Sequence, residues 1–422
     1  MRTGSKRLLR DLNQNLVLNT IASHEAISRT DIAHETGLPA ATVTRITREF
    51  LDAHLITEEL ATESGGGRPP ILLRINPTTG FIVGVKLRED SMTVAVCDLG
   101  SVVIYTREAT LPEGKEPEAV CDAIATAVSD TVRAAQVPEE RLLGVGIGVA
   151  GLIDSVAGMC RYSAIMGWRD VELQVPLEAR LGVPVCVDND VNTLAVAERL
   201  FGLARTTGDF VVVTIGRGIG LGVVLSGEIY RGTQGGAGEF GHTTIDVSAD
   251  TPECNCGKRG CLEAIASDYG ILRAALHREP GDHVEAEMQA LRARTDDPEV
   301  QRIFARAGEV LGAAIANLIN IFDPALIVLT GEGVQAGDLL LKPMREAIPR
   351  HVFGRSFDQS TLAVTSTDEI AWARGAASLI FQEVFHPPIY ESGATTMMDS
   401  LLALSSKSAP KRTASARATT QR

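Results

Sequence analysis

The first fifty residues place apolar side chains at helical spacing. From Lys6 to Ala22, leucines and isoleucines return every three or four positions, which predicts one amphipathic helix. Arg29 to Glu35 predicts a short second helix, Gly37 a turn, and about Pro39 to Ala53 a third helix. The chain therefore begins with a compact helical unit.

The second and third of these helices have the pattern of a helix-turn-helix. Ala33 is small where the helices cross, Gly37 stands in the turn, and Val43 is an apolar anchor. Hydroxyl and guanidinium groups on the third helix suit the DNA major groove and its phosphates. The candidate DNA contacts are Thr42, Thr44, Arg45 and Arg48. The alternative interpretation is a solvated helix on a small interaction domain.

Two strand-like runs follow, Leu55 to Thr57 and Ile71 to Ile75, joined by a glycine-rich loop. The loop holds Arg68 between glycines and prolines, and such an arginine can enter a narrow minor groove. Together these elements predict a winged helix-turn-helix domain over residues 1–76. Alternatively, the glycines form only a flexible linker.

From Phe81 onward the pattern changes to short β-rich runs separated by glycine turns. Three strands, a helix from Pro117 to Gln136 and a buried strand from Leu142 to Val149 occur in that order. The same order returns from Phe210 and ends at the strand Ala325 to Leu329. A duplicated unit of this kind predicts two similar lobes with a ligand-binding cleft between them. We expect one lobe at 77–190, closed by a helix at 370–385, and the other at 191–369.

Composition supports a soluble protein of two or three domains. The chain has 422 residues, of which 45% are hydrophobic and 22% charged. Because no apolar run is long enough for a membrane span or a signal peptide, we expect a cytoplasmic protein with no membrane partner. Thiols stay reduced in that compartment, so clustered cysteines indicate a metal rather than disulfides.

Charge is distributed unevenly along the chain. The formal net charge is −13, yet residues 1–80 carry nine Lys/Arg and nine Asp/Glu. A nucleic-acid contact over the whole surface is thereby excluded, and any DNA contact must be local to the N-terminus. Residues 405–422 are rich in Ser, Ala and Thr, with basic residues and no acid, which predicts a disordered basic tail.

Three of the seven cysteines fall within eight residues, shortly after a Gly-Glu-Phe-Gly-His run. The candidate metal ligands are His242, Cys254, Cys256 and Cys261. One imidazole and three thiolates form a complete set for a structural Zn²⁺ site. Glu239 and Glu263 lie among these ligands without being needed by the metal, so a loop stiffened by zinc could present them to a small polar ligand. The alternative is a chance cluster of buried thiols.

A polar run stands between the two predicted lobes, where the strand from Val183 ends and a helix to about Leu200 begins. It contains Asp188, Asn189, Asp190 and Asn192. Two acids and two amides at such a place can hydrogen-bond a polyol or serve as a base. The run could equally be a helix N-cap with surface polar residues.

These elements together resemble the ROK family, which contains sugar-responsive repressors and sugar kinases with the actin-like ATPase fold. The resemblance covers the chain from the winged helix to about residue 385. Its most specific motifs are GEFGH and CNCGKRGCLE. It implies an α/β protein in which an N-terminal winged helix-turn-helix precedes a two-lobed actin-like (ribonuclease H-like) domain.

The resemblance also implies residue roles. Asp190 would stand at the position of the catalytic base, and His242 would use one ring nitrogen on zinc while facing a sugar. By this resemblance the effector-binding residues are Gly151, Asn189, Asp190, Glu239, His242 and Glu263.

Three stretches depart from the pattern of the family's kinases. Their Asp-x-Gly-Gly-Thr phosphate loop is replaced here by Lys86 to Asp90, Arg217 replaces a small threonine, and Glu332 interrupts a triple glycine. Because phosphoryl transfer depends on positioning and charge neutralisation, these changes predict that the chain is not an enzyme and that Asp190 is a vestigial base.

The sequence therefore predicts a transcriptional repressor of carbohydrate genes that binds operator DNA as a homodimer or homotetramer. A sugar or sugar-phosphate effector would release it, and Arg217, or Lys86 with Arg88, could neutralise an effector phosphate. The alternative is a sugar kinase that phosphorylates a hexose with ATP. A third possibility is a regulator that binds a transporter component instead of a sugar.

Overall fold

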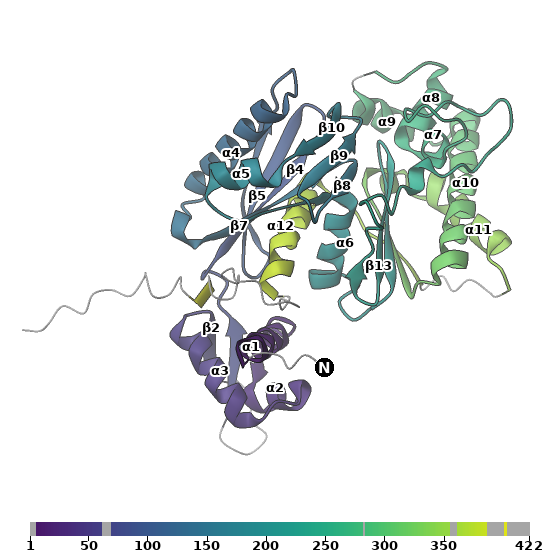
Figure 1. Ribbon diagram of the computed structural model, residues 1–422. Coiled ribbons are helices and arrows are strands. Elements are labelled where there is room, and N and C mark those ends of the chain that lie inside the picture. The colour runs from purple at the N-terminus through teal and green to yellow at the C-terminus, as the bar shows by residue number, and fades with distance from the viewer. Residues whose placement is uncertain (1–5, 61–68, 282, 355–360, 386–400, 403–422) are drawn as a thin grey trace, which may run out of the picture.

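The computed structural model describes residues 6–60, 69–281, 283–354, 361–385 and 401–402. It consists of a small N-terminal head below two sheets that stand side by side (Figure 1). Arg68 and the tail predicted at 405–422 lie outside the described residues, so the expectations about them stay predictions.

The head has the elements of a winged helix. They are α1 (Lys6–Ala22), β1 (Ile27–Ser28), α2 (Arg29–Thr36), α3 (Ala40–Asp52), β2 (Ile56–Leu60) and β3 (Ile71–Ile75). Gly37 ends α2 with a φ of 66°, a left-handed conformation that glycine adopts without steric cost. The three strands pair in the order β1-β3-β2. The pattern did not predict β1, because two residues are too few to show a period.

Both large sheets have five strands. The first contains β4 (Phe81–Leu87), β5 (Ser91–Asp98), β6 (Val103–Thr110), β7 (Leu142–Val149) and β11 (Val185–Asn189). The second contains β12 (Phe210–Ile215), β13 (Ile219–Leu225), β14 (Glu228–Ile229), β15 (Leu326–Thr330) and β16 (Leu362–Val364). Their orders, β6-β5-β4-β7-β11 and β14-β13-β12-β15-β16, correspond strand for strand. The predicted duplication is therefore present in the fold.

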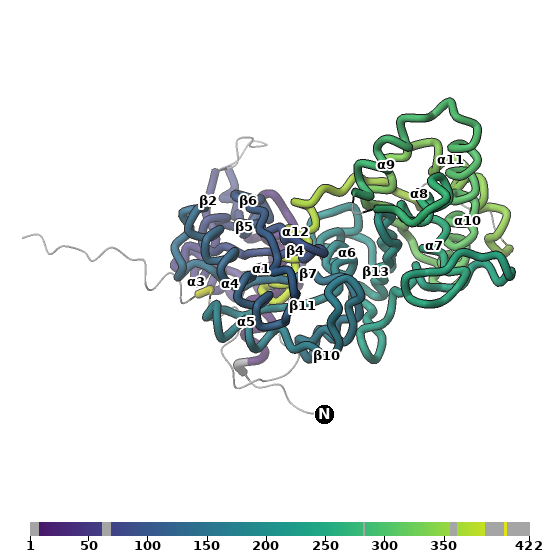
Figure 2. The backbone as a smooth tube through the Cα atoms, turned by 90° about the horizontal axis from the view of Figure 1, so that it is seen from above, coloured from purple at the N-terminus to yellow at the C-terminus, as the bar shows by residue number. Residues whose placement is uncertain are grey.

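Helices cover the sheets on both sides. On the first sheet lie α4 (Pro117–Ala134) and α5 (Gln174–Leu181), and the second lobe contains α7 (Leu262–Ala266), α8 (Asp268–Leu276), α9 (Val284–Arg292), α10 (Pro298–Phe322) and α11 (Asp338–His351). Between the sheets lie α6 (Asp190–Phe201) and α12 (Glu369–Phe385), as Figures 1 and 2 show. No helix among the described residues is long and apolar enough to cross a membrane.

Short elements fill the connections. These are the 3-10 turns Glu139–Arg141, Phe240–His242 and Glu332–Ala336, and a sheet of β8 (Leu152–Asp154), β9 (Met159–Ser163) and β10 (Trp168–Glu172). Sequence patterning did not predict this small sheet, because its three strands are short and only partly buried.

The helix α12 lies directly against the first sheet because two strands carry glycine beneath it. A Cβ at Gly84 would lie 1.8 Å from the carbonyl oxygen of Ala373, and one at Gly146 would lie 1.9 Å from that of Ala376. No side chain fits in these spaces, so the glycines set the distance between helix and sheet. The position of α12 decides what its two ends contact.

The C-terminal half of α12 packs into the same hydrophobic core as the winged helix. Ile21 of α1, Leu143 of β7 and Phe381 of α12 are all fully or almost fully buried in that core. After α6, the Arg205 side chain donates from Nη2 to the carbonyl oxygen of Ser23, which follows α1, at 2.7 Å. The head is thus joined both to α12 and to the segment that follows α6.

Candidate functional site: an interlobe site, a metal loop and a DNA-binding helix

The polar residues predicted between the lobes lie at one edge of the first sheet. The parallel strands β4, β7 and β11 place Lys86, Gly148 and Asp188 in register with one another. The carboxyl ends of parallel strands meet at one edge, which is where open α/β sheets bind ligands. We call the residues Lys86, Asn189, Asp190, Glu239 and Glu263 the interlobe site.

Asp190 is paired with a cation in this structure. Lys86 Nζ contacts Asp190 Oδ2, and the two side chains are only 10% and 11% exposed. The ammonium group also lies 4.6 Å from the centre of the Trp372 ring, within the range of a cation–π contact. The other Asp190 oxygen accepts a hydrogen bond from the Val191 amide at 2.9 Å. Asp190 is therefore engaged on both oxygens.

Asn189 is the N-cap of α6. Its Oδ1 accepts from the amides of Val191 at 2.9 Å and Asn192 at 3.3 Å, which satisfies two free N–H groups of the first turn. Its Nδ2 donates to the Gly151 carbonyl at 3.0 Å. The capping interpretation is thus right for Asn189, and this residue links Gly151 to the helix that carries Asp190.

A buried ion pair beside these residues was not predicted from the sequence. Asp188 is 0% exposed and accepts from Arg231 through both Nε, at 2.8 Å, and Nη2, at 2.7 Å. The two residues are 43 positions apart, so no local pattern predicts the pair. It ties the end of β11 to the segment after β14.

The two extra acids of the metal loop also face this region. Glu263 Oε2 accepts from the Ile219 amide at 3.1 Å, beneath the turn between β12 and β13. Burial raises the pKa of Glu239; His242 opposes the shift, while the carboxylates of Glu263 and Asp190 add to it. Acids from three separate segments therefore converge at the interlobe site.

The four predicted metal ligands lie together. Their ligand atoms are all within 4.8 Å of one another. Cys254 Sγ lies 3.6 Å from His242 Nδ1, and Cys256 Sγ lies 3.7 Å from Cys261 Sγ. Zn–S bonds of about 2.3 Å in a tetrahedron require ligand separations of about 3.8 Å, so the donor set fits zinc.

The metal loop is closed by glycine turns. Gly257 and Gly260 have φ values of 84° and 72°, which allow the chain to reverse between the cysteines. The Gly257 amide donates to the Cys254 carbonyl at 2.8 Å. Cys261 is the N-cap of α7, and Glu263 stands in the first turn of that helix. A metal held by the loop would therefore fix the helix that presents Glu263.

The turns that the resemblance assigns to phosphate binding contact one another through side chains. Arg217, after β12, forms an ion pair with Glu89, after β4, at 2.7 Å. Arg88 pairs with Glu369 at the start of α12 at 2.9 Å and with Glu108 at 3.0 Å. Each of these turns is thus neutralised from within the chain.

Glu332 fills the space beside the turn between β12 and β13. A Cβ at Gly216 would lie 2.3 Å from Glu332 Oε2, so this carboxylate rests directly on the turn. Trp372 Nε1 donates to the other carboxylate oxygen at 3.4 Å. Trp372 therefore joins Glu332 to Lys86, which lies against the same ring.

The recognition helix α3 presents the expected side chains. Thr44, Arg45 and Arg48 are exposed and Thr42 is half-buried. Arg45 forms an ion pair with Glu49 at 2.7 Å. Thr47, on the same helix, is fully buried and accepts a hydrogen bond from Arg29 Nε at 3.0 Å, so it does not face DNA.

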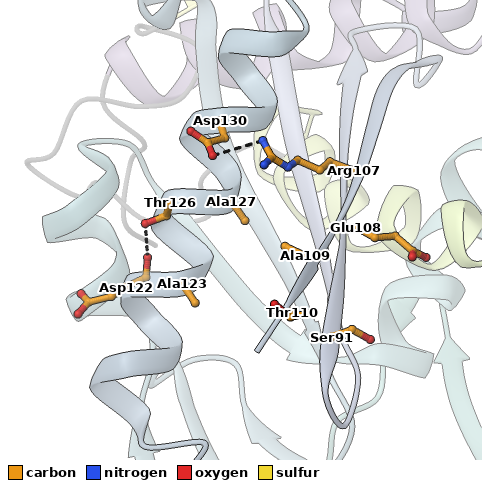
Figure 3. A pocket seen from close by; sticks show the side chains of 10 residues that line it. All are labelled: Ser91, Arg107, Glu108, Ala109, Thr110, Asp122, Ala123, Thr126, Ala127 and Asp130. Carbon is orange, nitrogen blue, oxygen red and sulfur yellow. Dashed lines mark hydrogen bonds and ion pairs between the residues drawn. The ribbon is translucent and has the colours of Figure 1, made fainter. Parts of the chain in front are cut away.

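A surface groove of about 610 Å³ lies elsewhere, between β6 and α4 (Figure 3). Ala109, Ala123 and Ala127 line it, and Arg107 reaches across to Asp130 at 3.3 Å. None of the predicted site residues lines this groove. Its charged side chains are already paired: Arg107 with Asp130, Asp122 with Arg180 and Glu108 with Arg88. They offer little to orient a ligand, so the interlobe site is the stronger candidate.

Fold and site together define a class: a winged helix joined to a two-lobed sugar-kinase-like domain, with a metal loop of one histidine and three cysteines. The chain belongs to the ROK family, whose profile matches residues 82–383. A winged helix-turn-helix DNA-binding profile matches residues 10–57.

Three similar proteins illustrate the family. The xylose repressor of Caldicellulosiruptor bescii is 29% identical over 399 residues, which cover 92% of this chain and 100% of that protein. The crystal structure of a ROK family transcriptional regulator, a homologue of the E. coli MLC protein, is 28% identical with a TM-score of 0.75 and covers 94% of this chain and 99% of that one. A ROK family glucokinase from Streptomyces griseus, solved with glucose and AMPPNP, is 29% identical with a TM-score of 0.61 and covers 72% of this chain and 100% of that one.

Proposed function

We propose that this protein is a DNA-binding transcriptional repressor of carbohydrate genes, and that a sugar bound at the interlobe site controls the affinity of the protein for its operator. The observation that carries the proposal is the position of α12. Its first turn, with Glu369 and Trp372, lies at the interlobe site, and its last turns share a hydrophobic core with the winged helix. Ligand binding and DNA binding thus act on one rigid element.

The proposed mechanism is a shift between two arrangements of the chain. A sugar can release DNA only if it binds more tightly to the arrangement in which the two winged helices of an oligomer do not fit their half-sites. We therefore propose a homodimer or homotetramer on a palindromic operator, acting in the cytoplasm.

The proposed effector contacts are hydroxyl groups on carboxylates. Glu239, Glu263 and Asp190 supply acceptors from three segments, and His242 stands beside Glu239 with Nε2 3.9 Å from its carboxylate. Asn189 acts here by positioning, because its amide is already bonded to Gly151 and to α6. Zinc on His242, Cys254, Cys256 and Cys261 would hold Glu263 in place.

We further propose that the protein is not a sugar kinase, although a glucokinase shares its fold. Lys86 pairs with the carboxylate that would accept the hydroxyl proton. Protonation of Asp190 would leave the buried Lys86 ammonium group without its counter-charge, which disfavours general-base chemistry at this position. Glu89 and Glu332 place negative charge where ATP phosphates would need neutralisation. ATP turnover with a panel of hexoses tests this, and turnover that disappears in Asp190→Asn would contradict it.

The function itself is tested by fluorescence anisotropy on DNA from upstream of the protein's own gene. We expect binding that is weakened by a sugar, and D-xylose is the first to try because a full-length relative is a xylose repressor. Failure to bind any fragment of that region would refute the proposal.

A further inference from the structure

Three cations near the interlobe site have carboxylate partners within the chain. Lys86 pairs with Asp190, and Arg217 with Glu89 at 2.7 Å. Arg88 pairs with Glu369 at 2.9 Å and with Glu108 at 3.0 Å. These are the three cations that the sequence analysis suggested could neutralise an effector phosphate. The structure gives each of them a partner inside the chain.

Lys86 is the most tightly held of the three. It and Asp190 are each about nine-tenths buried, and its ammonium group lies over the Trp372 ring. Turning Lys86 toward a ligand phosphate would leave the Asp190 carboxylate buried without a counter-charge, which is strongly unfavourable. Lys86 is therefore committed to Asp190.

Acidic side chains also line the site. Glu263 Oε2 accepts from the Ile219 amide at 3.1 Å, the Glu239 carboxylate lies 3.9 Å from His242 Nε2, and Glu332 rests on the turn at Gly216. A phosphate dianion placed among these carboxylates is repelled, whereas each carboxylate accepts a hydrogen bond from a sugar hydroxyl. The site thus offers many acceptors, while Lys86, Arg88 and Arg217 are already paired.

We propose that the effector is an uncharged sugar and that sugar phosphates are excluded, with Lys86 held by Asp190 in a buried ion pair. This inference rests on the proposed function, since it names the ligand of that repressor. Lys86 is then a specificity-determining residue: it neutralises Asp190 and leaves no charge for a phosphate.

The test is a binding comparison on the full chain with matched ligands. Isothermal titration is run with D-xylose, D-glucose, N-acetyl-D-glucosamine, D-glucose 6-phosphate and N-acetyl-D-glucosamine 6-phosphate. We expect at least one neutral sugar to bind, and each phosphate ester to bind at least about tenfold more weakly than its parent sugar. A phosphate ester that binds more tightly than its parent, or a panel in which nothing binds, overturns the proposal.

A variant sharpens the comparison. Glu89→Gln keeps the size of the Glu89 side chain but removes the negative charge that pairs with Arg217. Arg217 is then free to attract a phosphate, so the preference for the parent sugar over its 6-phosphate should fall by about threefold or more. The control is Glu285→Gln, an exposed acid on α9, which should leave the preference unchanged. An unchanged preference in Glu89→Gln counts against the proposal.

Operator binding distinguishes a wrong effector class from a wrong repressor function. If DNA is bound and is released by a phosphate ester but by no neutral sugar, only the effector class is wrong. If no DNA from the upstream region is bound, the repressor function itself is wrong.

Discussion

Replacing Lys86 with methionine is the perturbation with the largest expected effect at the interlobe site. Methionine keeps the length of the side chain and its packing against Trp372 but removes the charge that pairs with Asp190. The two partners are 10% and 11% exposed, so solvent screens the loss very little. Breaking a buried pair in this way costs about 3–5 kcal/mol of stability.

The assay is thermal unfolding of four proteins: wild type, Lys86→Met, Asp190→Asn and the double variant. At about 2–4 °C per kcal/mol for a domain of this size, Lys86→Met should lower the Tm by roughly 6–20 °C. The double variant has two neutral groups and should recover much of that loss, with a coupling energy of about 1.5 kcal/mol or more. Glu285→Gln serves as the surface reference, with an expected change within about 0.5 kcal/mol.

Two results would refute the reasoning. One is a Lys86→Met protein as stable as the Glu285→Gln reference. The other is strict additivity of the two single variants, because residues that form a buried pair cannot contribute independently. Either result would mean that Lys86 and Asp190 are hydrated in solution and that the ion pair does not close the site.

Three other expectations concern the metal, the DNA and the coupling between sites. Cys256→Ser should reduce bound zinc, measured by mass spectrometry, from about one ion per chain to near none. Burial raises the pKa of the Cys254 thiol to about 12 without metal, so protons compete with zinc for this ligand. The affinity of the site for zinc should therefore fall as the pH falls. Arg48→Ala should weaken operator binding by about 1–3 kcal/mol. The control Arg302→Ala, at an exposed position on α10, should leave operator binding unchanged. Equal operator affinities of the two variants would exclude α3 as the reading helix. Arg205→Ala removes the 2.7 Å bond to Ser23 and should change sugar-induced release of DNA by about 2- to 30-fold in an anisotropy titration; unaltered release would show that this bond carries no coupling.

Local sequence features predicted most of the elements. The helix α1 and the strands β3 and β7 have the bounds that the hydrophobic pattern gives, because each buries one face or a continuous apolar run. The strands β4 and β12 begin at the predicted residues Phe81 and Phe210, and the matching orders of the two sheets agree with the predicted repeat. The short strands β1, β8 to β10 and β16 were missed, since tertiary pairing rather than composition stabilises them.

The sequence by itself determined that this protein has a DNA-binding head, a duplicated α/β body and a loop with one histidine and three cysteines spaced for a metal, because turns, periodicity and ligand spacing act over a few neighbouring residues. Only the tertiary structure decided that Asn189 caps a helix, that Asp188 pairs with Arg231, and that Lys86 neutralises Asp190. The partners in the two ion pairs come from two strands, a helix and a loop that are far apart in the chain, and their charges meet only where the fold removes water between them.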